Sequence, residues 1–179
     1  KVEVLEGEAI LVEHINYMYE FYLSTSEKKW GRPYLSKDFF SRIHQTMCNK
    51  LVLFLAYVDG NCVAGTINFK NGKCLYGRYW GCNGNFRSLH FELCYYQPIE
   101  YAIRKGISLF EAGAQGEHKI QRGFEPTLTR SHHWVAEPGF QPAIKDFCAR
   151  DIDQVKAYKV DASQLLPFKE GALKDAKSL

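Results

Sequence analysis

Three stretches of the chain repeat their apolar residues at the spacing of an α-helix. Residues 14–29 predict an amphipathic helix, since the apolar positions recur as i, i+3, i+4 and i+7. A second helix is expected after Ser36, whose short polar side chain suits an N-cap, with Asp38 in the first turn where the helix dipole favours an anion. A last helix is expected over about 138–158, followed by a loosely held tail.

Apolar runs separated by turn residues predict a sheet. The runs 51–58, 62–69 and 74–82 are typical of an antiparallel meander. A two-residue turn at Asn71 and Gly72 would place Cys62 opposite Gly81 and would align no pair of cysteines across the hairpin.

A further helix is predicted from about Leu89 to Lys105, where Gly106 would end it. Pro98 lies inside this helix, removes one backbone donor and crowds the carbonyl of Cys94, so a kink is expected there. Strands are then expected at 107–113 and at about 127–135, with a polar loop between them.

Composition and charge limit the class of protein. Hydrophobic residues make up 46% of the 179 residues and aromatic residues 15%, which predicts one globular domain over 1–179, with a core at about 7–158 and a loose tail at 159–179. Charges of both signs are scattered along the chain, so the net charge of +3 forms no basic stripe, and duplex nucleic acid is not expected as a partner. The chain opens on Lys1 rather than Met, which suggests a piece of a longer protein.

The cysteines and the apolar runs suggest a location. The six cysteines have no regular or metal-ligand spacing, so reduced thiols and no bound metal are expected. The longest apolar run, 51–58, is too short for a membrane span, and no signal-peptide pattern opens the chain. A cytoplasmic protein is therefore predicted.

Polar side chains concentrate after the strand expected at 107–113. Glycines at 113, 116 and 123 let the backbone turn there. Within a dozen positions the stretch carries carboxylates, bases and amides that are typical of a site: Glu111, Gln115, Glu117, His118, Lys119, Gln121 and Arg122.

Three segments resemble a known family: LYGRYWG at 75–81, LHFELCYYQPIEYAI at 89–103 and FEAGAQGEHKIQRGFEP at 110–126. They are similar to the FemAB-like, GNAT-fold proteins of peptidoglycan biosynthesis or recognition, over about residues 7–168. The resemblance implies an α/β (α+β) fold of GNAT type, with a mostly antiparallel twisted central sheet flanked by helices. Residues 7–12 are the candidate for the first strand of that fold. It also implies that this segment is the C-terminal half of a larger chain.

The resemblance implies transfer of an acyl or aminoacyl group to the amine of a small-molecule or peptide-like acceptor. Such a reaction needs a base for the amine's proton and donors for the developing oxyanion. The candidate bases are Glu92, which follows the spacing of Tyr96, Ile99 and Ile103, and Glu111 at a strand end. Each has a structural alternative: Glu92 would complement the helix dipole, and Glu111 would pair with an arginine.

Other polar residues are candidates for binding substrate. Arg78 alternates with Tyr76 and Trp80, which predicts a guanidinium between two aromatic side chains on one face, either a substrate platform or a stacked core arginine. In the polar loop, the cationic side chains would hold an anionic group, or the loop's charges would pair among themselves. The candidates for substrate binding are Arg78, Trp80, Gln115, Glu117, His118, Lys119 and Arg122.

The loop before residue 89 occupies the place where acetyltransferases of this fold hold the coenzyme A pyrophosphate. Asn83, Gly84 and Arg87 are the candidates to bind the donor there, but the glycine spacing departs from the usual pattern and Phe86 would intrude. The donor is therefore acyl-coenzyme A or, as in some FemAB relatives, aminoacyl-tRNA. The alternatives to an enzyme are a non-catalytic ligand-recognition module, or half of a site completed by an N-terminal domain or by a second copy.

Overall fold

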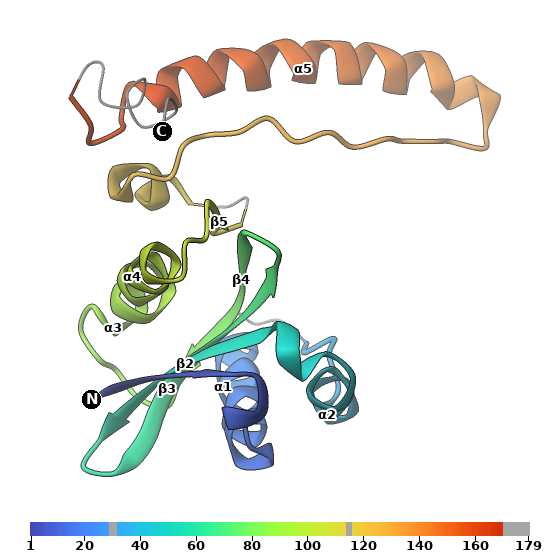
Figure 1. Cartoon of the computed structure of the whole chain (residues 1–179). Helices are drawn as coiled ribbons and strands as arrows, with labels where there is room; N and C mark the ends of the chain where they lie inside the picture. The colour runs from blue at the N-terminus through green and yellow to red at the C-terminus, as the bar shows by residue number, and fades with distance from the viewer. Residues whose placement is uncertain (29–31, 114–115, 170–179) are drawn as a thin grey trace. The chain divides into compact units, whose positions relative to one another are not determined.

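The computed structural model describes residues 1–28, 32–113 and 116–169 (Figure 1). The chain divides into two compact units, Lys1–Ala114 and Gln115–Leu179, and each is described by itself. The single domain predicted from the sequence stays a prediction.

A five-stranded sheet organises the first unit, and its strands are ordered as in the chain. Neighbouring strands are antiparallel, except that β4 and β5 run parallel. The strands are β1 (Val2–Glu6), β2 (Leu51–Val58), β3 (Asn61–Asn71), β4 (Cys74–Cys82) and β5 (Leu109–Glu111). The predicted meander is confirmed. The strand expected at 7–12 is wrong, because β1 lies earlier and Gly7–Ala9 form a 3₁₀ turn, after which Ile10 is buried in the core.

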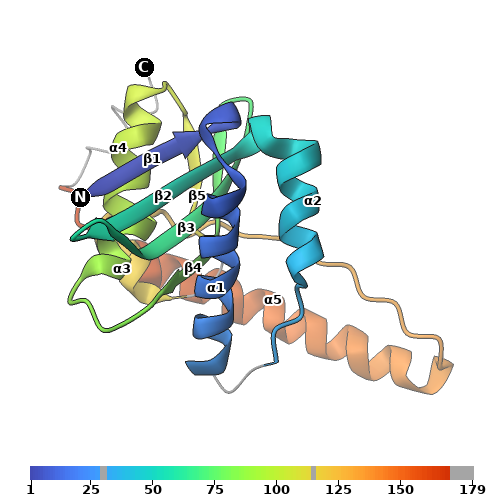
Figure 2. The same cartoon turned by 90° about the horizontal axis from the view of Figure 1, so that it is seen from below.

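One face of the sheet is covered by α1 (Val12–Lys28) and α2 (Lys37–Met47), as Figure 2 shows. The predicted cap of α2 is confirmed, because Ser36 Oγ accepts a hydrogen bond from the Phe39 N–H at 3.3 Å. Met18 and Phe21 on α1 are fully buried against β2 and β3. This face therefore holds the larger of the unit's two apolar clusters.

The opposite face is covered by a continuous helical run: α3 (Leu89–Phe91), a π-helical turn (Glu92–Tyr96) and α4 (Gln97–Arg104). Leu93, Pro98 and Tyr101 face the sheet and are buried. The apolar positions that the sequence placed on Glu92's face turn outward instead, with Ile103 76% exposed. The reason is the π turn, which adds a residue to the helix and puts positions five apart on one face.

Pro98 explains this π turn. The Gln97 N–H bonds to the carbonyl of Glu92, five residues earlier, which is the spacing of a π turn. The next residue, Pro98, has no N–H, so the carbonyl of Leu93 receives no hydrogen bond from it. Thr66 Oγ1, buried on β3, donates to the Leu93 carbonyl at 3.4 Å and accepts from Asn68 Nδ2 at 3.1 Å. The kink predicted at Pro98 is thus a change of helical register that a buried threonine supports.

The end of α4 and the start of β5 follow from Gly106. The Gly106 φ is +63°, its N–H bonds to the carbonyl of Ile103, and the Ile107 N–H bonds to that of Ala102 at 2.8 Å. This pair of bonds is the Schellman arrangement that ends helices at glycine. The predicted stop is confirmed, and the chain enters β5 three residues later.

A cluster around Glu6 ties β1 to β3 and α4. The carboxylate accepts hydrogen bonds from Lys70 Nζ at 2.5 Å, from the Tyr101 hydroxyl at 2.8 Å and from Lys105. These bonds, that of Lys105 first, lower the pKa of Glu6 from 4.5 to about 2. Glu6 is therefore charged at neutral pH and holds three elements together.

The β3–β4 hairpin differs from the predicted register. The two central residues of its turn are Gly72 and Lys73, because Asn71 pairs with Cys74, one place later than a turn at Asn71 and Gly72 would give. Gly72 has a φ of +56°, as the first position of a type II′ turn requires. The new register still aligns no two cysteines, and none of the six cysteines forms a disulfide in the described part of the chain.

The second unit consists of short turns and one long helix. A 3₁₀ turn spans Glu117–Arg122, another spans Pro138–Phe140, and α5 (Gln141–Ser163) runs beyond the end expected at 158. The strand expected at 127–135 is wrong, since these residues form no regular structure. The described part of this unit offers no other strand, and a strand needs a partner for its backbone groups.

Candidate functional site

A fork opens in the first unit where β4 and β5 stop pairing. The two parallel strands pair only over Cys74–Tyr76 and Leu109–Glu111. Beyond this point β4 continues through Gly77–Cys82, and the described chain places no strand against its outer edge. An open stretch of strand edge therefore begins directly after the residue pair Tyr76 and Glu111.

The main chain of this open edge is partly engaged by α1. The Asn83 N–H bonds to the Val63 carbonyl of β3. In an antiparallel pair, alternate residues direct their N–H and C=O groups toward the partner strand, so those of Cys82 and Trp80 point away from β3. Thr25 Oγ1 donates to the Trp80 carbonyl at 2.9 Å, and Ser24 Oγ donates to the Cys82 carbonyl at 3.1 Å. These two bonds satisfy the outward carbonyls of Trp80 and Cys82.

A β-bulge interrupts β4 at the start of the open edge. Gly77 pairs with Asn68 and Tyr79 pairs with Ile67, so Arg78 is the extra residue. The bulge reverses which face of the sheet the following side chains of β4 point to. Tyr76 pairs with Phe69, on the face that α1 covers, whereas Trp80 pairs with Thr66, on the opposite face. The prediction that Tyr76, Arg78 and Trp80 share a face is therefore wrong.

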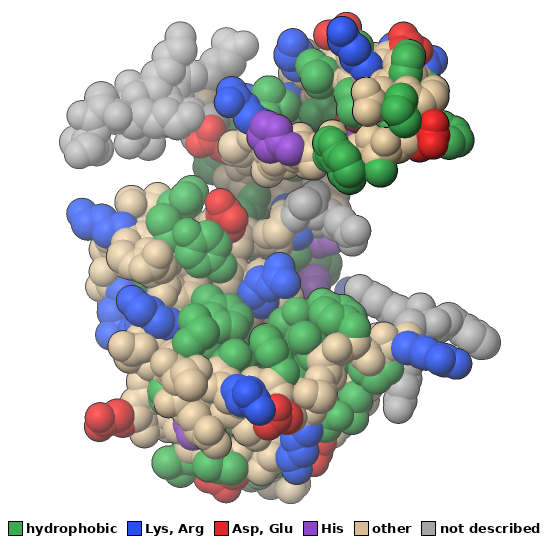
Figure 3. All heavy atoms as spheres, turned by 90° about the vertical axis from the view of Figure 1, so that its right-hand side faces the viewer, with side chains coloured by type: hydrophobic (Ala, Val, Ile, Leu, Met, Phe, Trp, Pro, Cys, Tyr) green, Lys and Arg blue, Asp and Glu red, His purple; other side chains and the backbone are tan. Residues whose placement is uncertain are grey.

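The exposed Arg78 side chain lies over the Tyr79 ring, with 5.3 Å from Cζ to the ring centroid. Arg78 Nη2 is 3.4 Å from the Tyr79 hydroxyl, which in turn is 3.0 Å from the hydroxyl of Tyr34. This places a cation and two phenols together on the α1 and α2 side of the fork. Figure 3 shows apolar side chains gathered on this face of the unit, with Lys and Arg side chains among them.

On the other side of the sheet, Glu92 begins the π turn. Its Oε1 accepts a hydrogen bond from Gln97 Nε2 at 2.8 Å, a contact between residues five apart that the π spacing allows. The half-buried carboxylate is thereby held in one orientation. Trp80 on β4 packs edge-on against His90 on α3, with 5.2 Å between the ring centroids, so the start of the helical run adjoins the open edge.

Glu111 occupies the point where the fork divides. It is exposed, pairs in register with Tyr76 and leads out of β5. The pKa of Tyr76 is raised, chiefly by a hydrogen bond with Cys74, and the charge of Glu111 adds to the effect. Neither Arg78 nor any other described residue of this unit forms a salt bridge with Glu111.

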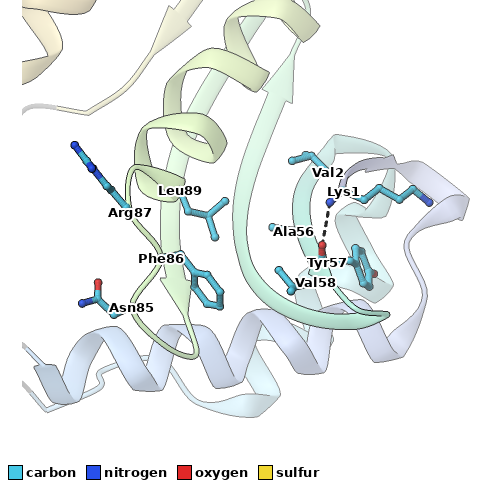
Figure 4. A pocket seen from close by; sticks show the side chains of 9 residues that line it. All are labelled: Lys1, Val2, Ala56, Tyr57, Val58, Asn85, Phe86, Arg87 and Leu89. Carbon is cyan, nitrogen blue, oxygen red and sulfur yellow. Dashed lines mark hydrogen bonds between the residues drawn. The ribbon is translucent and has the colours of Figure 1, made fainter.

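The loop from 83 to 88 joins the open edge to the helical run. Asn83 continues the β3 ladder, Gly84 has a φ of +123°, and all three donor candidates in this loop are exposed. A pocket of about 360 Å³ lies between the loop and the ends of β1 and β2. Figure 4 shows Phe86 turned toward the strand residues across this pocket and Arg87 turned away from it. Arg87 lines the pocket, but its side chain points out of it.

The remaining predicted residues belong to the second unit. Glu117 Oε1 accepts a hydrogen bond from the Tyr158 hydroxyl at 3.2 Å, and Arg122 Nη1 donates to the His118 carbonyl at 2.7 Å. The Lys119 carbonyl accepts the Phe124 N–H at 3.2 Å, which closes the turn. Gln115 lies outside the described residues.

Three residues escaped the sequence reasoning: Tyr34, Tyr79 and Thr66. The signal for Tyr79 was its place in the aromatic run YGRYW, but a simple alternation put it on the wrong face. Nothing local marks Tyr34 or Thr66, because their partners are more than 25 positions away along the chain.

Two further findings concern the described part of the chain as a whole. No group of three or more His, Cys, Asp and Glu side chains is arranged there to hold a metal ion. None of its helices is both long and apolar enough to cross a membrane.

Comparisons place this geometry among known proteins. A family model described as FemAB-like, peptidoglycan biosynthesis/recognition, matches residues 1–170. No curated protein matches the sequence at a significant level. Among solved structures, an aminoglycoside acetyltransferase, meta-AAC0020, from an uncultured soil metagenomic sample in complex with sisomicin has 10% identity and a TM-score of 0.51, covering 76% of this chain and 95% of that chain.

Two more solved structures have the same TM-score. The aminoglycoside N-acetyltransferase AAC(6′)-Iy in complex with CoA has 13% identity and a TM-score of 0.51, covering 76% of this chain and 95% of that one. A possible acetyltransferase from Clostridium difficile 630 has 12% identity and a TM-score of 0.51, covering 76% and 99%. At such identities the likeness shows the fold, and the predicted GNAT-like architecture is confirmed.

Proposed function

The chain belongs to the FemAB-like family, and from that premise we propose that it transfers an acyl or aminoacyl group to an amine. The observation that carries the proposal is the fork in the sheet. An open, bulged edge of β4, with its outward carbonyls already bonded to α1, carries Trp80, which packs against His90, two residues before the fixed carboxylate of Glu92.

The open edge suits the amide-containing arm of a donor. An extended molecule that lies along the edge beginning at Gly77 is bound like an added strand, through main-chain hydrogen bonds. Its reacting carbonyl would then lie near the bulge, where a backbone N–H of β4 stabilises the negative charge that develops on the oxygen. The phosphate end would lie toward Arg87 and the start of the helical run, where positive charge favours an anion.

Glu92 is the proposed base. A neutral amine attacks the donor carbonyl and loses a proton, which the carboxylate, held by Gln97, accepts directly or through a water. As the new C–N bond forms, the C–S bond of the thioester donor or the C–O bond of the aminoacyl ester breaks. The coenzyme A thiolate or the tRNA hydroxyl oxygen leaves and takes up this proton from Glu92. Glu111, exposed at the fork, is proposed to position the acceptor's ammonium group before it loses its proton. Glu117, His118, Lys119 and Arg122, in the polar turn of the second unit, remain candidates for binding substrate.

The location follows from the same chemistry. Six cysteines outside any disulfide fit a reducing compartment, and we propose that the reaction takes place in the cytoplasm, where acyl-coenzyme A and aminoacyl-tRNA are available as donors.

Titration with each donor tests the proposal. Acetyl-coenzyme A and a charged tRNA are added separately in a calorimeter, and label transfer from the bound donor to a pool of amines is then followed by mass spectrometry. Saturable binding of one donor with transfer supports the proposal, and Arg87→Ala should weaken that binding about tenfold. The control Arg104→Ala alters an exposed arginine at the far end of the same helical run. If neither donor binds, the proposal is contradicted.

The unusual loop favours one second function. Phe86 fills space beside the pocket where a phosphate-binding glycine loop would leave its backbone open, which suits a module that binds a ligand without transferring anything. Under that function, ligand affinity survives the replacement of both Glu92 and Glu111 by glutamine and no donor binds.

A further inference from the structure

The bulge in β4 places a guanidinium at the end of a chain of phenols. Arg78 donates to the Tyr79 oxygen, and the Tyr79 and Tyr34 hydroxyls share a hydrogen bond of 3.0 Å in which either one is the donor. One of the two phenol hydrogens therefore remains for a ligand. The cation at one end of this chain of hydrogen bonds polarises it and strengthens that donor. The hydrogen bond to Tyr79 also raises the pKa of Tyr34, which keeps its proton at neutral pH.

These rings are fixed before a ligand arrives. Tyr22, only 5% exposed, accepts the backbone N–H groups of Tyr34 at 2.9 Å and Leu35 at 3.2 Å through its hydroxyl. Its ring meets those of Tyr34 and Tyr79 edge-on, with centroid distances of 6.1 and 5.4 Å. A ligand that binds here loses less free energy to ordering the protein, because the side chains are already positioned.

No carboxylate of the described chain neutralises Arg78. Arg42, an exposed arginine on α2, pairs with Asp38 at 2.6 Å, whereas the salt bridges among the described residues include none with Arg78. Arg78 is exposed, and Tyr34 is 75% exposed. A guanidinium without an ionic partner, flanked by hydroxyl donors, matches the two oxygens of a carboxylate.

On the premise of the proposed transferase, we infer that Arg78, Tyr79 and Tyr34 form a subsite for a carboxylate of the acceptor. The enzyme then selects amines that also carry a carboxylate, such as amino acids and peptides with a free C-terminus. The position agrees with this role, because Arg78 lies two residues beyond Tyr76, where β4 parts from β5 and the reacting carbonyl is expected.

A matched pair of probes tests the subsite without any donor. Glycylglycine and glycylglycinamide have the same amine and differ in the carboxylate, and their binding to the full 179-residue chain is followed by NMR at the backbone N–H signals of Gly77 and Tyr79, which every variant retains. Glycylglycine should bind about tenfold more tightly than the amide. This preference should vanish in Arg78→Gln, shrink in Tyr34→Phe and persist in the control Arg42→Gln.

The outcomes separate the subsite from the activity. Equal affinity for the two probes, absence of binding by both at millimolar concentration, or a preference that survives Arg78→Gln overturns the subsite. Transfer to amines at rates independent of a carboxylate also overturns it, while leaving the transferase intact. A carboxylate preference in a chain that binds neither donor supports the subsite and contradicts the proposed function.

Discussion

Replacing Gly81 with alanine is expected to be the most damaging small change in the first unit. A Cβ built on Gly81 would lie 1.9 Å from the backbone oxygen of Phe21 and 2.4 Å from its carbonyl carbon. Neither atom can rotate aside, since both belong to the main chain of α1. The helix must therefore move away from β4 by more than an ångström, and the hydrogen bonds from Ser24 and Thr25 to β4 would lengthen or break.

The size of the effect follows from what is lost. Forcing an extra methyl into a packed core costs about 1–3 kcal/mol, and each of the two strained hydrogen bonds adds about 1 kcal/mol. We expect Gly81→Ala to lower the free energy of unfolding by about 4 kcal/mol, a large share of the ~5–15 kcal/mol that holds most domains together.

Two other glycines of the sheet provide a graded control for the same substitution. At Gly65 the new Cβ would meet side-chain atoms, Met18 Sδ at 2.6 Å and Leu55 Cδ2 at 2.7 Å, which can shift at a smaller cost of about 2 kcal/mol. At Gly77 the nearest atom lies at an ordinary 3.5 Å, so the change should be within about 1 kcal/mol of neutral.

Urea denaturation followed by circular dichroism measures the three variants against the parent chain. The expected order of loss is Gly81, then Gly65, then Gly77. If Gly81→Ala unfolds at the same urea concentration as Gly77→Ala, α1 does not cross β4 as closely as the structure requires, and the open edge described above loses its support.

Three further predictions concern the charge cluster, the buried threonine and the candidate base. Glu6→Gln should flatten the pH dependence of the free energy of unfolding. The lowered pKa of Glu6 contributes stability that is fully present above pH 4.5 and is lost as the pH falls toward about 2. An acid titration of stability that is unchanged in the variant contradicts this. Thr66→Val should cost about 1 kcal/mol in urea denaturation, since the Leu93 carbonyl loses its donor, and a neutral result would show that carbonyl to be satisfied otherwise. Glu92→Gln should lower kcat about 100-fold or more with little change in melting temperature, because glutamine keeps the oxygen that accepts from Gln97. Glu111→Gln should mainly raise KM. Full activity in Glu92→Gln shows that Glu92 is not the base.

Local signals in the sequence were sufficient for most elements of the first unit. The cap at Ser36, the stop at Gly106 and the apolar runs of β2, β3 and β4 each depend on residues within a few positions of one another. Propensity, capping and periodicity act over that range, so these elements could be predicted. The family resemblance added the GNAT-like order of helices and strands.

The candidate site was predicted only in part. Glu92, Glu111 and Arg78 were found by residue type, but the bulge at Arg78 and the π turn at Glu92 changed which neighbours they meet. Each irregularity inserts one residue, and one residue reverses a strand face or rotates a helix face by about 100 degrees. A sequence pattern assumes regular elements, so it cannot locate such insertions.

The sequence by itself determined the helices, the meander and the chemical groups available near the fork. Only the tertiary structure decided that β4 keeps an open edge, that Tyr34 reaches Tyr79 from 45 positions away, and that Thr66 supports the turn before Pro98. The physical reason is distance along the chain. Local preferences fix each element, but a hydrogen bond between residues far apart in sequence exists only after packing has brought their elements together.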